Sequence, residues 1–131
     1  QEIKDNLPTM LKVASAYPDY QPVIAGAPGI DPAYYQEYIG SYPAKIVFGK
    51  TYPLLQHSAA ALVTSGTATL ETALFRVPQV VCYYVVAGQL ASFIFKHFFH
   101  TKYISLVNLI GGREIVQELF HPELTSFLIE R

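Results

Sequence analysis

The sequence predicts an α/β fold, a Rossmann-like parallel sheet with helices on both faces. Short apolar segments of the kind found in buried strands alternate along the chain with segments of helical spacing. The composition agrees, because 51% of the residues are hydrophobic and only 15% are charged. Strands that are covered by helices on both faces need few charged residues. A length of 131 residues suits one domain.

The predicted elements alternate from the first residues onward. Strands are expected at residues 22–25, 44–48, 60–63 and 79–83. Helices are expected over residues 2–16, 32–40, 53–58, 67–76 and 88–99. Asp31 followed by Pro32 is typical of an N-cap and a first helical residue. The alternation predicts parallel strands whose carboxyl ends meet at one edge, where ligands bind in such sheets.

The last part of the chain is less regular. We expect a short strand at residues 104–106 and a loop at 108–112. Residues 113–120 have helical spacing, and a last helix is expected from Pro122 or Leu124.

The rest of the chain is organised around residues 60–76. This stretch predicts a buried strand, a polar turn of hydroxyl residues and glycine, and a helix that begins inside the turn. The free N–H groups at such a helix start attract phosphate. Glu71, one turn into the helix, suits sugar hydroxyls better than phosphate. The alternative is a capped helix in which Ser65 or Thr67 is the cap and Glu71 completes the capping contact. Both interpretations are open on the residues alone.

Charge and cysteine content exclude several classes of protein. The formal charge of −1 gives no basic footprint for nucleic acid. Cys82, the single cysteine, lies in an apolar segment and is expected to be a buried side chain in a reducing compartment. No signal peptide is expected. Residues 77–95 carry no charge but contain proline, glycine and glutamine, so we expect a strand and a helix there instead of a membrane span.

Four segments together resemble a known family. They are Ser-Gly-Thr-Ala-Thr-Leu-Glu at 65–71, Val-Pro-Gln-Val-Val at 77–81, Ile-Ser-Leu-Val-Asn-Leu-Ile at 104–110, and Arg113-Glu114. Over nearly the whole chain the sequence is similar to the C-terminal domain of lipid-A-disaccharide synthases. Related nucleotide-sugar enzymes share the first segment, whereas the Ser105-Leu106 and Asn108-Leu109 block at this spacing is more specific.

The resemblance implies a fold and an activity. The fold would be the C-terminal half of a GT-B glycosyltransferase, with its first strand missing and the whole N-terminal domain absent. The enzyme would transfer 2,3-diacylglucosamine from its UDP donor to 2,3-diacylglucosamine 1-phosphate and release UDP, with inversion at the sugar carbon. No cofactor or metal is implied. Since the general base belongs to the N-terminal domain, this chain would bind the donor and be inactive alone.

The resemblance also assigns residues to the donor. Residues implied to hold the UDP phosphates are Ser65, Gly66, Thr67 and Thr69. Glu71 would bind the ribose, and Asn108 would contact the sugar or the diphosphate. Backbone groups near Phe48, Gly49 and Lys50 would meet the uracil, by analogy with related GT-B folds. The family commonly has proline where Val107 stands and glutamine where His121 stands.

The helix expected at 88–99 has an unusual surface. Phe93, Phe95, Phe98 and Phe99 do not fit on one stripe, and basic residues lie beside them. Such a surface fits an anionic membrane, and the acyl chains of the family's substrates agree with a cytoplasmic enzyme peripheral to the inner membrane. Packing on the absent domain, or on a second copy in a homo-oligomer, explains it equally well. His97 and His100 have metal-ligand spacing, but three converging ligands are needed, so no metal is expected.

Two other functions remain as alternatives. Another UDP-sugar enzyme of the same fold, such as a peptidoglycan N-acetylglucosaminyltransferase or a UDP-sugar epimerase, would share the turn at 65–71. A non-catalytic flavodoxin-like interaction module would use that turn as a helix cap only.

Overall fold

The computed structural model describes residues 2–64, 66–83 and 103–120, and it confirms the α/β class. The described helices are α1 (Glu2–Ser15), α2 (Pro32–Ile39), α3 (Thr51–Gln56), α4 (Gly66–Leu74) and α6 (Leu106–Gly111). The described strands are β1 (Val23–Gly26), β2 (Lys45–Phe48), β3 (Ala61–Val63), β4 (Gln79–Tyr83) and β5 (Gln117–Phe120). Each pair of neighbouring strands is parallel.

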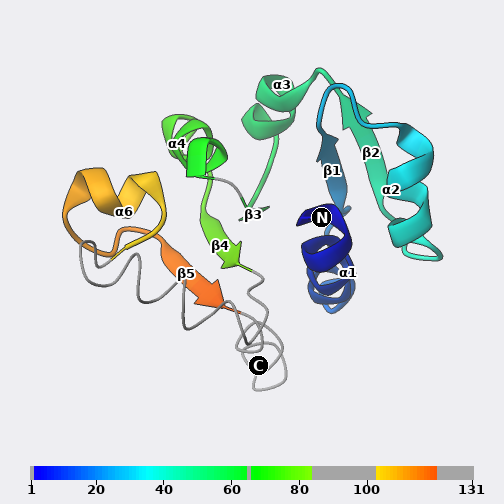
Figure 1. The fold of residues 1–131 in the computed structure, drawn as a ribbon, viewed down its shortest axis with the longest axis horizontal. Coiled ribbons are helices and arrows are strands. Elements are labelled where there is room, and N and C mark those ends of the chain that lie inside the picture. The colour runs from blue at the N-terminus through cyan, green and yellow to red at the C-terminus, as the bar shows by residue number, and fades with distance from the viewer. Residues whose placement is uncertain (1, 65, 84–102, 121–131) are drawn as a thin grey trace.

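The strands form two sheets, whereas one continuous sheet was expected. β1 pairs with β2, and β4 lies between β3 and β5. Among the described residues, no ladder joins β1 to β3. Figure 1 shows the arrows of β1 and β2 pointing in a different direction from those of β4 and β5. The carboxyl ends of the described strands therefore do not all meet at one edge.

Helix α1 packs on both sheets. Leu7 and Leu11 join a core cluster with Tyr35 and Ile39 of α2, against the side chains of β1 and β2. Val13 belongs to a second cluster, with Cys82 of β4 and Leu119 of β5. Figure 1 shows α1 between the two sets of strands. Burying a side chain of this size contributes about 1.5–3 kcal/mol, so α1 stabilises both sheets.

Local signals predicted α2 well. The Asp31 carboxylate accepts a hydrogen bond from the Ala33 N–H at 2.8 Å, and the helix begins at Pro32. Cys82 is buried as expected, and burial raises the pKa of its thiol to about 12. Such a thiol is not a nucleophile at neutral pH.

The prediction for residues 104–120 was wrong. Residues 106–111 are helical, because the Ser105 hydroxyl accepts the Asn108 N–H at 3.3 Å and caps α6. Residues 117–120 form β5 where a helix was expected, because they pair with β4 and bury Leu119. The helices expected at 88–99 and after Pro122 lie outside the described residues.

The backbone of β1 approaches an aromatic ring at Gly26. A Cβ atom at this position would overlap the Phe48 ring of β2. We expect Gly26→Ala to lower the free energy of unfolding by about 1–3 kcal/mol, because the ring must shift in a packed core. Urea unfolding measures the loss. A double variant with Phe48→Leu should lose less than the two single variants added together, and simple additivity would contradict this account.

Helix α4 ends in a Schellman motif with arginine at the left-handed position. The Val77 N–H donates to the Thr72 carbonyl at 3.2 Å, and the Arg76 N–H donates to the Ala73 carbonyl at 2.9 Å. The φ of Arg76 is 57°, which is strained for a residue with a Cβ.

Arg76→Gly should therefore raise the free energy of unfolding by about 0.5–1 kcal/mol, as measured in urea. Arg113→Gly is the matched control, because Arg113 is exposed and its φ is not positive. A gain from the control as large as that from Arg76→Gly would show that left-handed strain is not the cause.

Candidate functional site

The predicted strand, turn and helix are present at residues 61–74. β3 ends at Val63 and α4 begins at Gly66, while Ser65 lies outside the described residues. Gly66 is partly exposed and Thr67 is exposed. The N–H groups of the first turn of a helix have no partner within the helix, and the helix dipole adds positive charge there. This corner is therefore suited to an anion.

The buried face of α4 is made of threonines. Thr69 and Thr72 are almost fully buried, and their hydroxyls donate to the carbonyls of Gly66 and Ala68. Threonine can be buried in this way because its polar group is satisfied inside its own helix. The Gln79 amide donates to the Thr69 carbonyl at 2.9 Å. The Thr69 hydroxyl thus points into the fold, although the sequence suggested it as a phosphate ligand.

Glu71 is joined to α3, the helix that follows β2. The Tyr52 hydroxyl donates a hydrogen bond to Glu71 Oε1 at 3.2 Å. The Tyr52 ring also lies 5.3 Å, centroid to centroid, from the ring of Phe75. The hydrogen bond to Glu71 and the negative charge of that carboxylate raise the pKa of Tyr52. Glu71, which is expected near the ribose, therefore lies beside α3, the helix that directly follows the segment expected near the uracil.

The segment expected to meet the uracil offers backbone, not an aromatic ring. The Phe48 ring packs edge to face against Tyr35, with centroids 5.8 Å apart, at the first core cluster. Gly49 has a φ of 64°, and it is exposed together with Lys50. Tyr52, two residues further on, was not singled out from the sequence. Its position in a loop after a predicted strand was the available signal.

Asn108 is buried and every hydrogen-bonding position of its amide is used. Its Nδ2 donates to the Val116 carbonyl at 2.8 Å and to Glu118 Oε1 at 2.9 Å. Its Oδ1 accepts the N–H groups of Ile115 at 2.7 Å and Val116 at 2.9 Å. An asparagine side chain has two donors and two acceptor lone pairs, so no position is left for a ligand. The structure makes Asn108 the anchor between α6 and β5.

Glu118 completes this network. Its carboxylate accepts the N–H groups of Ile104 at 3.1 Å and Ser105 at 2.9 Å, in addition to the Asn108 amide. Burial, and to a smaller extent the charge of Glu118, raise the pKa of Tyr83 to about 12. The network holds α6 beside α4, and a Cβ added at Gly66 would lie 3.7 Å from Leu106.

Asn108→Ala should lower the free energy of unfolding by at least about 3 kcal/mol, because several buried groups lose their partners together. Chemical denaturation measures the loss. The matched control is Gln117→Ala in an exposed residue of the adjoining strand, which should change stability by no more than about 0.5 kcal/mol. Equal effects of the two substitutions would contradict the anchoring role.

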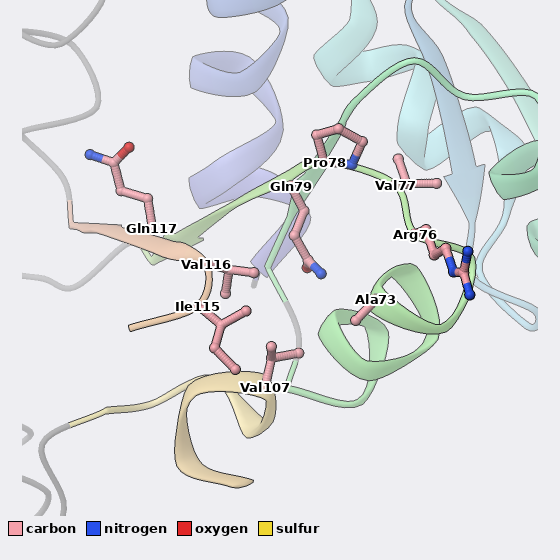
Figure 2. A pocket seen from close by; sticks show the side chains of 9 residues that line it. All are labelled: Ala73, Arg76, Val77, Pro78, Gln79, Val107, Ile115, Val116 and Gln117. Carbon is pink, nitrogen blue, oxygen red and sulfur yellow. The ribbon is translucent and has the colours of Figure 1, made fainter. Parts of the chain in front are cut away.

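A cavity of about 430 Å³ lies elsewhere, where β4 and β5 begin. Figure 2 shows Gln79 reaching from β4 toward the space between Ile115 and Ala73. The lining residues are Ala73, Arg76, Val77, Pro78, Gln79, Val107, Ile115, Val116 and Gln117. None of them is a predicted UDP ligand. The Gln79 Oε1 atom is buried and lacks a hydrogen bond.

Along residues 2–64, 66–83 and 103–120, no helix combines the length and the apolar character that crossing a membrane requires. Within the same ranges, no three side chains of histidine, cysteine, aspartate or glutamate form a group that could hold a metal ion.

The parallel strands, the intervening helices and the corner between β3 and α4 make this chain a Rossmann-like α/β domain. A family model described as Lipid-A-disaccharide synthetase matches residues 2–130. The chain belongs to this family, which confirms the resemblance inferred from the motifs.

Curated relatives agree with this assignment. Lipid-A-disaccharide synthase of Anaeromyxobacter dehalogenans is 36% identical over 99% of the chain and 36% of the relative. The enzymes of the same name from Rhodospirillum centenum and Psychromonas ingrahamii are 33% and 38% identical, over 89% and 82% of the chain. The matched parts are 29% of each of these two relatives. The chain thus spans about a third of the length of the relatives it matches.

Proposed function

We propose that this chain is the donor-binding part of a lipid-A-disaccharide synthase, and that it binds UDP at the corner between β3 and α4. The observation that carries the proposal is the start of α4 at Gly66, with the partly exposed carboxylate of Glu71 one turn further along the helix. The N–H groups suit a diphosphate and the carboxylate suits the ribose hydroxyls. Membership of the family supports the choice of UDP.

The proposed roles follow what the side chains can offer. Ser65, Gly66 and Thr67 hold the diphosphate, mainly through backbone N–H groups. Glu71 accepts hydrogen bonds from the ribose. The backbone at Phe48, Gly49 and Lys50 meets the uracil. Thr69 and Asn108 were expected as ligands, but their side chains are occupied inside the fold, so we assign them the shaping of the site.

The proposed reaction needs no metal or cofactor. An acceptor hydroxyl of 2,3-diacylglucosamine 1-phosphate attacks the sugar carbon of UDP-2,3-diacylglucosamine, and the bond to the UDP oxygen breaks. Negative charge develops on the leaving diphosphate, where the N–H groups of α4 stabilise it. The general base comes from an N-terminal domain. This agrees with the finding that the chain spans only about a third of the length of its relatives. The chain alone would then bind UDP without transferring the sugar.

We also propose that a strand precedes α1 and pairs with the edge of β1 or of β3. Each of these two edges pairs with no strand among the described residues. α1 packs on both sheets, so a strand that it covers lies beside one of them.

The acyl chains of the proposed substrates suggest where the enzyme works. We propose a cytoplasmic protein that is peripheral to the inner membrane. The surface at residues 93–99, which lies outside the described residues, would face the membrane, the N-terminal domain or a second copy in a homo-oligomer.

Titration with UDP tests the proposed site. In amide NMR spectra, UDP should shift the signals of residues 66–71. These residues contact the nucleotide through their N–H groups or lie next to residues that do. The signal of Gln117, beside the cavity, should not move. No shift at millimolar UDP would instead favour a non-catalytic interaction module.

Glu71→Ala tests the ribose contact. Its loss should weaken UDP binding about tenfold, because a hydrogen bond to a charged group is lost. Binding of inorganic pyrophosphate should not weaken, because the removed carboxylate only repels it. Calorimetry with the two ligands measures the difference. Equal weakening of both would remove Glu71 from the ribose site.

A further inference from the structure

We propose that Tyr52 is a positioning residue that orients the Glu71 carboxylate and so sets the preference of the site for ribose hydroxyls. This inference rests on the proposed function and deepens it, because it names a residue that controls how the site recognises the ribose of the nucleotide. It starts from the hydrogen bond of 3.2 Å between the Tyr52 hydroxyl and Glu71 Oε1.

The geometry leaves room for a ligand. A carboxylate has about four lone-pair sites on two oxygens, and Tyr52 uses one of them. From the part of the chain that the structure describes, no hydrogen bond reaches Oε2, and Glu71 is partly exposed. A donor held on one oxygen restricts rotation of the side chain, so less rotamer freedom is lost when a ribose diol binds the carboxylate.

Tyr52 is itself held in place by α4. Its ring lies 5.3 Å from the ring of Phe75, and the planes are tilted by 41°. Phe75 directly follows the last residue of α4, and its N–H donates to the Glu71 carbonyl at 3.3 Å, so the two side chains lie on one side of the helix end, one turn apart. Tyr52 therefore lies along α4, with its ring on Phe75 and its hydroxyl on Glu71.

A purely structural role explains this arrangement less well. Tyr52 is 54% exposed, and its hydroxyl bonds to a group that water also reaches. Exposed contacts of this kind contribute little to stability. The contact also joins α3, which follows the segment assigned to the uracil, to α4, which carries the residue assigned to the ribose.

The test compares UDP with 2′-deoxy-UDP in the wild-type chain and in Tyr52→Phe, which keeps the ring and removes the hydroxyl. The wild-type chain should bind UDP more tightly than the deoxy analogue. Tyr52→Phe should weaken UDP about three- to ten-fold and the analogue less, so the preference shrinks. The free energy of unfolding in urea should be unchanged. A residue with only a structural role would not reduce the preference for UDP while leaving stability unchanged.

Two controls sharpen the result. Tyr20→Phe removes a hydroxyl from a tyrosine that is 60% exposed and should leave both affinities unchanged. In the Glu71→Ala background, Tyr52→Phe should have no further effect, because the two residues act through one contact.

The outcomes separate this inference from the proposed function. A wild-type chain that fails to bind UDP overturns the proposed function, and the inference with it. A wild-type chain that binds UDP and prefers it to the analogue, while Tyr52→Phe keeps both affinities, overturns the role of Tyr52 alone. Equal binding of the two nucleotides by the wild-type chain also overturns that role.

Discussion

Packing of α1 against two sheets is the constraint on which the described structure depends. Leu11 and Val13 are two residues apart, so they point to nearly opposite sides of the helix, and each is buried in a different core cluster. Among the described residues, no strand ladder joins β1 to β3. Hydrophobic burial, which has no preferred direction, joins the two sheets through α1.

A second, polar constraint shapes the wall beside α4. Asn108 and Glu118 together satisfy backbone N–H groups of Ile104, Ser105, Ile115 and Val116. These N–H groups belong to the irregular backbone on either side of α6. Within the described part of the chain, they make no hydrogen bonds within a helix or between strands. A buried amide and a carboxylate bond to them instead, so α6 keeps its place beside the start of α4. Asn108 in the shared motif therefore holds the backbone that lies next to α4.

The candidate site was only partly readable from the residues. The turn at 65–67 and Glu71 were predicted as ligands because hydroxyls, glycine and a helix start are local features that favour anions and sugars. The directions of Thr69 and Asn108 were not, since the same polar side chain serves a ligand or an internal carbonyl equally well. Tyr52 was missed because its partner lies 19 residues away, on another helix.

The order of strands and helices up to residue 83, the cap at Asp31 and the membership of the family were available from the chain before any coordinates. Each depends on neighbours within a turn or on motif residues at a set spacing. The division of the strands into two sheets, the strand at 117–120 and the burial of Asn108 emerged from the folded molecule alone. They depend on hydrogen bonds and packing between segments distant along the chain, where a partner strand or a buried carbonyl outweighs local preference.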